Sequence, residues 1–213
     1  KIPKWSEKKH IRLTGEVKFP GSYTIEEGDR LVDVIKRAGG YTKQAFLKGA
    51  VFTRESIRTL QQNKLNESLL KLKKRALATG SSNFGQESGM DPLKVAELVD
   101  SLARQAESLK PIGRISITLM NDLDSFQNSR SNLTLKESDT LHIPSFNDTI
   151  LVIGEVMSPS SLIFDSSNTE EYLKRVGGLT EMADDDYIYI VHANGEAERY
   201  KSGWFTSNID IKQ

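Results

Sequence analysis

The 213-residue chain contains no cysteine and no excess of charge of either sign, with 29 Lys and Arg against 29 Asp and Glu. Without cysteine it can form no disulfide bond, no cysteine-ligated iron–sulfur cluster and no thiolate nucleophile. It has no run of about 18 apolar residues, which excludes a bilayer-spanning helix. It also has no charged start followed by an apolar segment, as a signal peptide requires. The neutral total removes the simplest argument for binding nucleic acid or anionic lipid.

The composition is typical of a globular protein, with 37% hydrophobic and 27% charged residues. A length of 213 residues suits one large domain or two small ones. Because the chain begins at Lys1 rather than Met, we expect it to be a fragment whose targeting segment lies outside it.

The chain contains an internal repeat. Residues 10–42 align with residues 149–180 with one gap at Gly28, and 11 of the 32 aligned pairs are identical. The identical pairs include Gly-Glu-Val, Lys-Arg and Gly-Gly-x-Thr, in the same order in both copies. This order favours two copies of one structural unit.

Each copy is predicted to begin with a β-hairpin and a short helix. Apolar residues alternate over 11–25 in the first copy, and Pro-Gly at Gly21 predicts a type II turn between the strands. Apolar residues at helical spacing predict a helix over 31–38, with Asp29 as its N-cap. Gly39 is predicted to end that helix in the left-handed conformation.

A second pair of strands follows in each copy. In the second copy, strands at 187–191 and 198–200 are joined by Asn194-Gly195, a type I′ hairpin signal. In the first copy the corresponding strands, 50–53 and 114–119, lie far apart in the sequence. An insertion at the hairpin tip therefore separates them, at a position that tolerates insertion.

The insertion, at about residues 54–110, is predicted to be an antiparallel helical hairpin. Apolar stripes run over 57–76 and 95–109, the second helix starts with Asp91 and Pro92, and the Gly- and Ser-rich residues 79–89 form the turn. The hairpin would either project from the sheet as an arm or fold back over it.

The first copy closes with the strand 138–144, whose end at 142–146 is similar to residues 1–5. We therefore expect another unit before Lys1, with residues 1–9 as the linker that leads from it. The second copy lacks a corresponding strand before Gln213, so we expect it to be incomplete. The predicted fold class is α+β, with domains at 10–144 and 145–213.

Two segments of the first copy resemble a known family. Residues 13–25 read Leu-Thr-Gly-Glu-Val-x-Phe-Pro-Gly-x-Tyr-Thr-Ile and residues 31–40 read Leu-x-Asp-Val-Ile-x-Arg-Ala-Gly-Gly. They resemble the SLBB (soluble-ligand-binding β-grasp) domain. Residues 45–56, and the Gly-Arg-Ile strand at 113–115, look like the continuation in Wza-like outer-membrane polysaccharide export proteins. The second copy is less similar, because residues 158–162 lack Phe-Pro-Gly-x-Tyr.

The resemblance implies tandem β-grasp domains in the periplasmic segment of a Gram-negative capsule or exopolysaccharide export protein. Parts outside this fragment would attach it to the outer membrane. Such a protein would form a homo-oligomeric ring around a conduit and dock the inner-membrane copolymerase and synthesis machinery, without catalysis and without a cofactor. The alternative is a β-grasp module that binds a soluble ligand or free glycan and forms no conduit.

Other chemistry finds little support in the sequence. The three histidines lack partners at metal-ligand spacing, and residues 184–186, Asp-Asp-Asp, lack the ligand alternation of a calcium loop. Glu16 and Glu155 stand one in each copy, which favours a turn role over paired acid–base catalysis. Residues 54–75 carry seven Lys or Arg against two acids, but the repeats contain no motif that reads nucleic acid. A solvated helix face is the simplest interpretation of that basic segment.

Six aromatic residues are candidates for glycan or partner contact, because aromatic faces pack on sugar rings: Trp5, Phe19, Tyr23, Tyr41, Phe146 and Trp204. Packing in the core or the linkers is the competing interpretation of each.

The neutral charge also divides unevenly. Residues 1–144 carry 24 basic and 17 acidic residues, a formal charge of +7, whereas residues 145–213 carry 5 and 12, a charge of −7. We expect these opposed charges to guide the register of neighbouring units or subunits.

Overall fold

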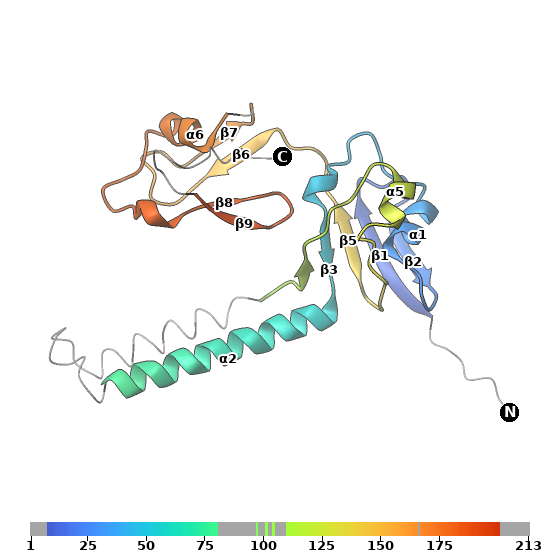
Figure 1. Ribbon diagram of the computed structural model, residues 1–213, viewed down its shortest axis with the longest axis horizontal. Coiled ribbons are helices and arrows are strands. Elements are labelled where there is room, and N and C mark those ends of the chain that lie inside the picture. The colour runs from blue at the N-terminus through green and yellow to red at the C-terminus, as the bar shows by residue number, and fades with distance from the viewer. Residues whose placement is uncertain are drawn as a thin grey trace. The chain divides into compact units, whose positions relative to one another are not determined.

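The computed structural model describes residues 8–80, 97, 101, 104, 110–165 and 167–200 (Figure 1). The chain divides into unit 1, Lys1–Phe52 with Ser116–Gln213, and unit 2, Thr53–Ile115. In unit 1 we distinguish an N-terminal half, residues 8–52 and 116–144, from a C-terminal half, residues 145–200.

The sheet of the N-terminal half is mixed, has the strand order β2-β1-β5-β3-β4, and includes the three residues at the two ends of unit 2, Thr53 and Arg114–Ile115. The strands are β1 (Lys9–Gly15), β2 (Gly21–Ile25), β3 (Val51–Thr53), β4 (Arg114–Ile115) and β5 (Thr140–Ile143). β1 pairs antiparallel with β2, as the alternation predicts, and parallel with β5. The strand that comes last in the sequence therefore lies in the middle of the sheet.

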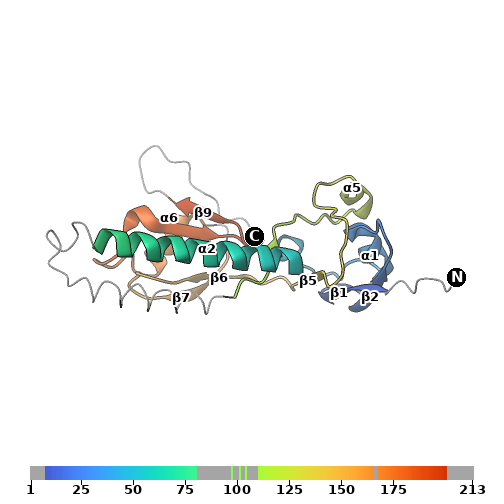
Figure 2. The ribbon, with the colours of Figure 1, turned by 90° about the horizontal axis from the view of Figure 1, so that it is seen from below.

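Helix α1 (Leu31–Arg37) lies beside the hairpin of β1 and β2 (Figure 2). Its predicted apolar stripe is confirmed, because Leu31, Val34, Ile35 and Ala38 are fully buried. Together with buried side chains of β1, β3 and β5 they form the core of this half. The short helix α5 (Leu123–Gln127) adds the buried Phe126. Burial of this apolar surface is the main favourable contribution to folding.

The start of α1 differs from the sequence prediction. Its N-cap is Arg30, and the predicted cap, Asp29, instead forms an ion pair with Arg37 at 2.6 Å. The side chain of Asn132, only 2% exposed, reaches the helix and accepts a hydrogen bond from the Val32 amide at 3.0 Å. The predicted left-handed stop is confirmed at Gly39, where φ is +77°.

The predicted type II turn at Gly21 is wrong. Gly21 is not among the residues with positive φ; it begins β2 and pairs with Leu13. The left-handed residue of this hairpin is Gly15, with φ +80°. A Cβ atom there would lie 1.9 Å from the carbonyl oxygen of Ile143, so only glycine lets β5 pass this close to the turn.

The C-terminal half contains two separate two-stranded antiparallel sheets and one helix. They are β6 (Thr149–Val152) with β7 (Ser160–Ile163), α6 (Thr169–Arg175), and β8 (Ile188–Val191) with β9 (Ala197–Tyr200). The predicted turn between β8 and β9 needs correction. Between β8 and β9 only Gly195 has positive φ, whereas a type I′ turn needs two such residues. The His192 amide donates to the Glu196 carbonyl, so a three-residue loop joins the strands.

Backbone contacts of the N-terminal half recur in the C-terminal half at the aligned positions. Thr149 pairs with Ile163 in β6 and β7, as His10 pairs with Thr24 in β1 and β2. The amide that follows each Gly-Glu-Val turn donates to the second glycine of the Gly-Gly loop at 3.0 Å in both halves. The mixture of sheets and helices confirms the predicted α+β class.

Unit 2 contains the long helix α2 (Glu55–Gly80). Two of its leucines are exposed, Leu60 at 52% and Leu70 at 54%. The predicted partner helix at 95–109 lies outside the described residues, except for residues 97, 101 and 104. No helix within the described ranges is long and apolar enough to cross a membrane.

Candidate functional site

The repeated motifs meet at one place in each half of unit 1. Thr42 donates its hydroxyl to the carboxylate of Glu16 at 2.5 Å, and Thr180 donates to Glu155 at 2.9 Å. Each contact ties the Gly-Glu-Val turn to the loop that follows the helix. The two glutamates therefore hold the turns in place, each within its own half.

Two of the six candidate aromatics meet at the tip of the β1–β2 hairpin. The Phe19 ring is 66% exposed, and a Cβ at Gly39 would lie 3.1 Å from it. The hydroxyl of Tyr23 donates to the Phe19 carbonyl at 2.5 Å. An exposed ring that packs beside a glycine, on a backbone held by a neighbouring tyrosine, is suited to stacking on a flat partner such as a sugar face. The C-terminal half has Ser158 and Leu162 at the aligned positions.

Tyr41 contacts the Gly-Glu-Val turn through its backbone. Its backbone bridges to Val17, and its hydroxyl is buried without a hydrogen-bond partner among the described residues. This burial raises the pKa of Tyr41, so the phenol stays neutral. Tyr41 therefore supports the turn, and its hydroxyl does not face solvent.

Phe146 belongs to a different cluster. Its ring is 56% exposed and packs edge-on against Phe46, with the ring centroids 5.6 Å apart. Hydrogen bonds from the Phe46 amide to Pro144 and from the Phe146 amide to Gln44 fix the chain where it leaves β5. The other two candidates, Trp5 and Trp204, lie outside the described residues.

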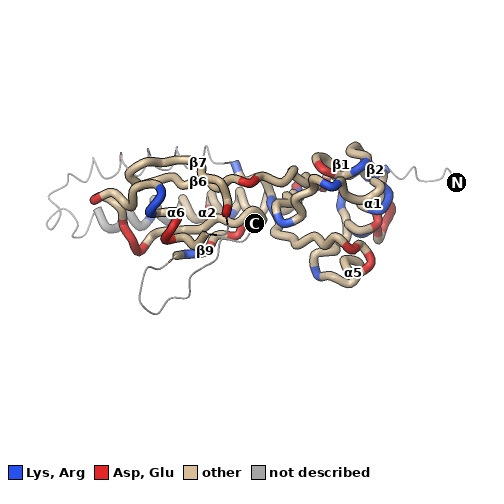
Figure 3. The backbone as a smooth tube through the Cα atoms, turned by 90° about the horizontal axis from the view of Figure 1, so that it is seen from above, with Lys and Arg blue, Asp and Glu red and all other residues tan. Residues whose placement is uncertain are grey.

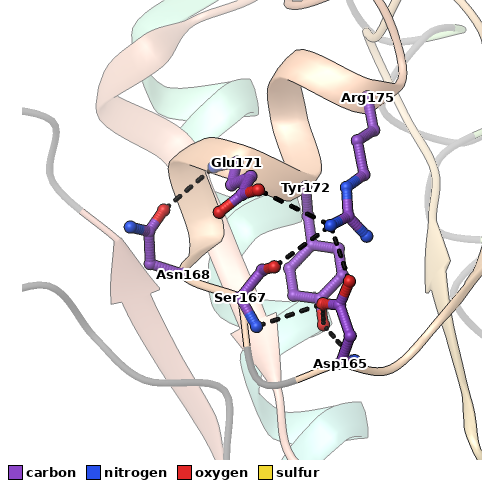
Figure 4. Close-up of polar contacts among 6 residues, drawn as sticks. All are labelled: Asp165, Ser167, Asn168, Glu171, Tyr172 and Arg175. Atoms are coloured by element: carbon purple, nitrogen blue, oxygen red, sulfur yellow. Dashed lines mark hydrogen bonds and ion pairs between the residues drawn. The ribbon is translucent and has the colours of Figure 1, made fainter.

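A polar network between α6 and the segment that precedes it was not predicted from the sequence (Figure 4). The carboxylate of Asp165 accepts hydrogen bonds from the Ser167 amide, the Tyr172 hydroxyl and, at 2.6 Å, the Arg175 guanidinium. Hydrogen bonds from Ser167 and then Arg175 hold the pKa of Asp165 well below its usual value. The signal available in the sequence was the repeated Lys-Arg pair, since Arg37 binds Asp29 in the N-terminal half.

An open apolar cavity of about 700 Å³ lies between β6 and β8. It is lined by the side chains of both strands and of α6, including Ile150, Val152, Tyr172, Ile190 and Val191. Several neighbouring apolar residues are largely exposed: Leu151 at 65%, Ile153 at 68% and Val191 at 71%. The cavity offers apolar contact and strand edges.

Titratable side chains in the described ranges form no group of three that could hold a metal ion. The histidine rings contact other side chains: His10 contacts Thr24, His142 contacts Thr14, and His192 contacts Glu198.

Comparison with known proteins agrees with these features. Residues 11–55 match the SLBB domain family. The chain is similar to two Escherichia coli sequences described as polysialic acid transport protein KpsD, with 28% identity over 145 and over 143 residues. The matches cover 68% and 67% of this chain but only 24% of each relative, so the chain corresponds to a small part of their length. Residues 11–55 are therefore similar to SLBB domains, and the predicted resemblance to the SLBB domains of Wza-like polysaccharide export proteins is confirmed.

Proposed function

We propose that the chain is a periplasmic segment of a polysaccharide export protein with a structural and transport role. The observation that carries this proposal is the SLBB match over residues 11–55, together with the similarity to a polysialic acid transport protein over two thirds of the chain. The proposal gives the chain no catalytic step and no cofactor.

Its architecture would be two tandem β-grasp domains, at 10–144 and 145–213, the first interrupted by a helical hairpin at about 54–110. The recurrence of hairpin register, turn glycines and Glu–Thr contacts in the two halves of unit 1 supports the tandem part. Helix α2 supports the first arm of the helical hairpin.

Copies of the full-length protein would assemble into a ring around the exported polymer. Parts outside this chain would attach the ring to the outer membrane, and the inner-membrane copolymerase and synthesis machinery would dock to it. Exposed apolar side chains in the C-terminal half support an interaction surface, among them Met182, 86% exposed, and Tyr187, 63% exposed.

Native mass spectrometry of the detergent-extracted full-length protein tests the ring. We expect one closed stoichiometry, and a strict monomer would contradict the conduit. Inactivation of the gene tests transport, because the polymer should disappear from the cell surface and accumulate inside the cell, and the intact gene should restore export. Unchanged surface polymer would contradict the transport role.

A binding module without a conduit is the second candidate, supported by the exposed Phe19 ring and its contact with Tyr23. It predicts saturable binding of capsule or exopolysaccharide fragments to this chain. The substitution Phe19→Ala should then weaken binding, whereas Phe146→Ala, in a separate aromatic cluster, should leave it unchanged. Absence of binding to any such fragment would reject this candidate.

A further inference from the structure

In the described ranges, the two halves of unit 1 differ in their sheets, because only the N-terminal half has a strand between its two strand pairs. In the N-terminal half β5 lies between β1 and β3 and joins the β1–β2 pair and the β3–β4 pair into one sheet. In the described C-terminal half, β6–β7 and β8–β9 remain two sheets, visibly apart in Figure 1. The apolar cavity of about 700 Å³ lies between β6 and β8, at the position that β5 occupies in the other half.

The side chains around this cavity are mostly apolar, and those of β6 are less buried than the aligned side chains of β1. Ile11 and Leu13 of β1 are 1% and 0% exposed, whereas the aligned Ile150 and Val152 of β6 are only half-buried. Strands β6 and β7 carry no charged residue, as Figure 3 shows. Uncharged, apolar strand edges of this kind are templates for pairing with another strand.

Gly154 supports the same conclusion. A Cβ at the aligned Gly15 would lie 1.9 Å from the β5 backbone, but a Cβ at Gly154 would meet nothing within 4 Å among the described residues. Both glycines adopt positive φ. Among the described residues, the turn at Gly154 thus leaves room for a strand to pass.

The sequence also indicates where such a strand would come from. Residues 131–137, Ser-Asn-Leu-Thr-Leu-Lys-Glu, lead directly into the segment that forms β5. Within residues 131–137, the Leu133 carbonyl and the Asn132 side chain accept hydrogen bonds from the first amides of α1, those of Leu31 and Val32. Residues 207–213 read Ser-Asn-Ile-Asp-Ile-Lys-Gln, a close match to 131–137.

We propose that the cavity between β6 and β8 is the seat of one further parallel strand, supplied in cis by the residues that follow Gln213 in the full-length protein. Its chemistry would be that of Asp139–Pro144, an acidic residue followed by alternating apolar residues. The inference rests on the tandem part of the proposed function and is independent of transport.

The register of this strand follows from β5. Leu13 and Gly15 pair with Leu141 and Ile143, so the second and fourth residues of the new strand would pair with Val152 and Gly154. The Glu16 amide donates to the Ile143 carbonyl at 2.7 Å, and the Glu155 amide would make the same bond. The two hairpins would then share one sheet in the order β7-β6-new strand-β8-β9.

To test whether a strand occupies this cavity, a copy of residues 138–145 is appended directly after Gln213. Amide hydrogen exchange should slow by about tenfold or more at Leu151, Ile153 and Glu155 in the extended protein, because ladder hydrogen bonds protect amides. The matched control is the same copy with its Leu and Ile replaced by Asp, which should give no protection. Equal exchange rates in the extended, control and parent proteins would overturn the proposal.

The register can be tested separately, because the chain has no cysteine of its own. With Val152→Cys, a cysteine at the copied Leu position should form a disulfide within one chain, since paired strands bring Cα atoms into bonding range. A cysteine at the copied His position, one residue further, should not. Cross-linked dimers in place of the intrachain disulfide would overturn the in-cis source in favour of a strand from a second copy.

The full-length protein gives the final comparison. Its exchange rates at Leu151, Ile153 and Glu155 should match those of the extended chain, and fast exchange there would overturn the proposal. A full-length protein that is monomeric but has protected amides would refute the ring and still support the additional strand. The two proposals can therefore fail separately.

Discussion

At the residue scale, the Asp165–Arg175 contact links the end of β7 to the last turn of α6. The position of Arg175 near the helix C-terminus also suits a cation, because that end of a helix carries partial negative charge. The guanidinium lies 5.3 Å from the centre of the Tyr172 ring as well, so one side chain contacts an acid and an aromatic face. Ionised Asp165 is the form that these contacts favour.

This predicts how the C-terminal half responds to acid. Because the folded state lowers the pKa of Asp165, its contribution to stability is present above the unfolded value of about 3.9 and is lost as the pH falls through the folded value. Asp165→Asn should remove this part of the acid sensitivity, so the melting temperature should vary less with pH below about pH 4 than in the parent.

Thermal unfolding of the two proteins between about pH 2 and pH 7 measures this difference. The control is Asp185→Asn, which changes an exposed carboxylate in the turn before β8 and should leave the parent's acid dependence in place. The same acid dependence in Asp165→Asn and the parent would show that the Arg175 contact does not stabilise the fold.

At the scale of elements, the aligned glycines Gly15 and Gly154 form a natural comparison. Gly15→Ala forces a Cβ into the Ile143 carbonyl and should cost about 4 kcal/mol or more in the free energy of unfolding. A Cβ in Gly154→Ala would meet no described atom within 4 Å. This substitution should therefore lower the free energy of unfolding only by the cost of positive φ for alanine, about 1–2 kcal/mol.

Chemical denaturation of both variants, followed by circular dichroism, gives the two losses. Equal losses in this chain would contradict the role assigned to β5 at Gly15. In the protein extended by the β5 copy, Gly154→Ala should become as costly as Gly15→Ala, because a strand would then pass beside it.

Local elements were predictable from the sequence, and distant contacts were not. The stripe of α1 and the alternation of β1 follow from periodicities of a few residues, which a reader of the sequence can see. The cap of α1 could not be found in this way, because Asn132 lies 100 residues from Val32. Asp29 had the right position for a cap, but Arg37 engages its carboxylate.

The candidate site was predicted only in part for a similar reason. Of the six aromatic residues, the structure joins Phe19 with Tyr23, while Tyr41 supports the turn and Phe146 packs on Phe46. Aromatic side chains serve both cores and contact surfaces, so residue type alone does not separate these roles. The cavity beside β6 was missed because its walls come from β6, α6 and β8, which are separate in the sequence.

At the scale of the whole molecule, the charges of +7 and −7 on residues 1–144 and 145–213 suggest electrostatic guidance of assembly. The structure identifies which acids can serve as probes. Asp184 accepts a hydrogen bond from the Asp186 amide, and Asp186 binds Arg199, so both stabilise their own turn. Glu181 and Asp185 are exposed and better suited for charge reversal.

The double variant Glu181→Lys with Asp185→Lys should weaken self-association of the full-length protein by about tenfold at low salt, and added salt should weaken the parent in the same direction. Neutralisation to Gln and Asn should have a smaller effect, as a matched control. Sedimentation velocity at two ionic strengths provides the measurement. Association insensitive to both salt and charge reversal would contradict electrostatic guidance.

The central position of β5 has a consequence for the order in which this protein can fold as it is made. The middle strand of the sheet is its last one in the sequence, and the whole of unit 2 precedes it. The β1–β2 hairpin and β3 can therefore join into one sheet only after unit 2 and β5 have been synthesised. Closure over so long a loop slows folding. A nascent chain therefore keeps its sheet open until residue 143 emerges, and synthesis of the following repeat has then already begun.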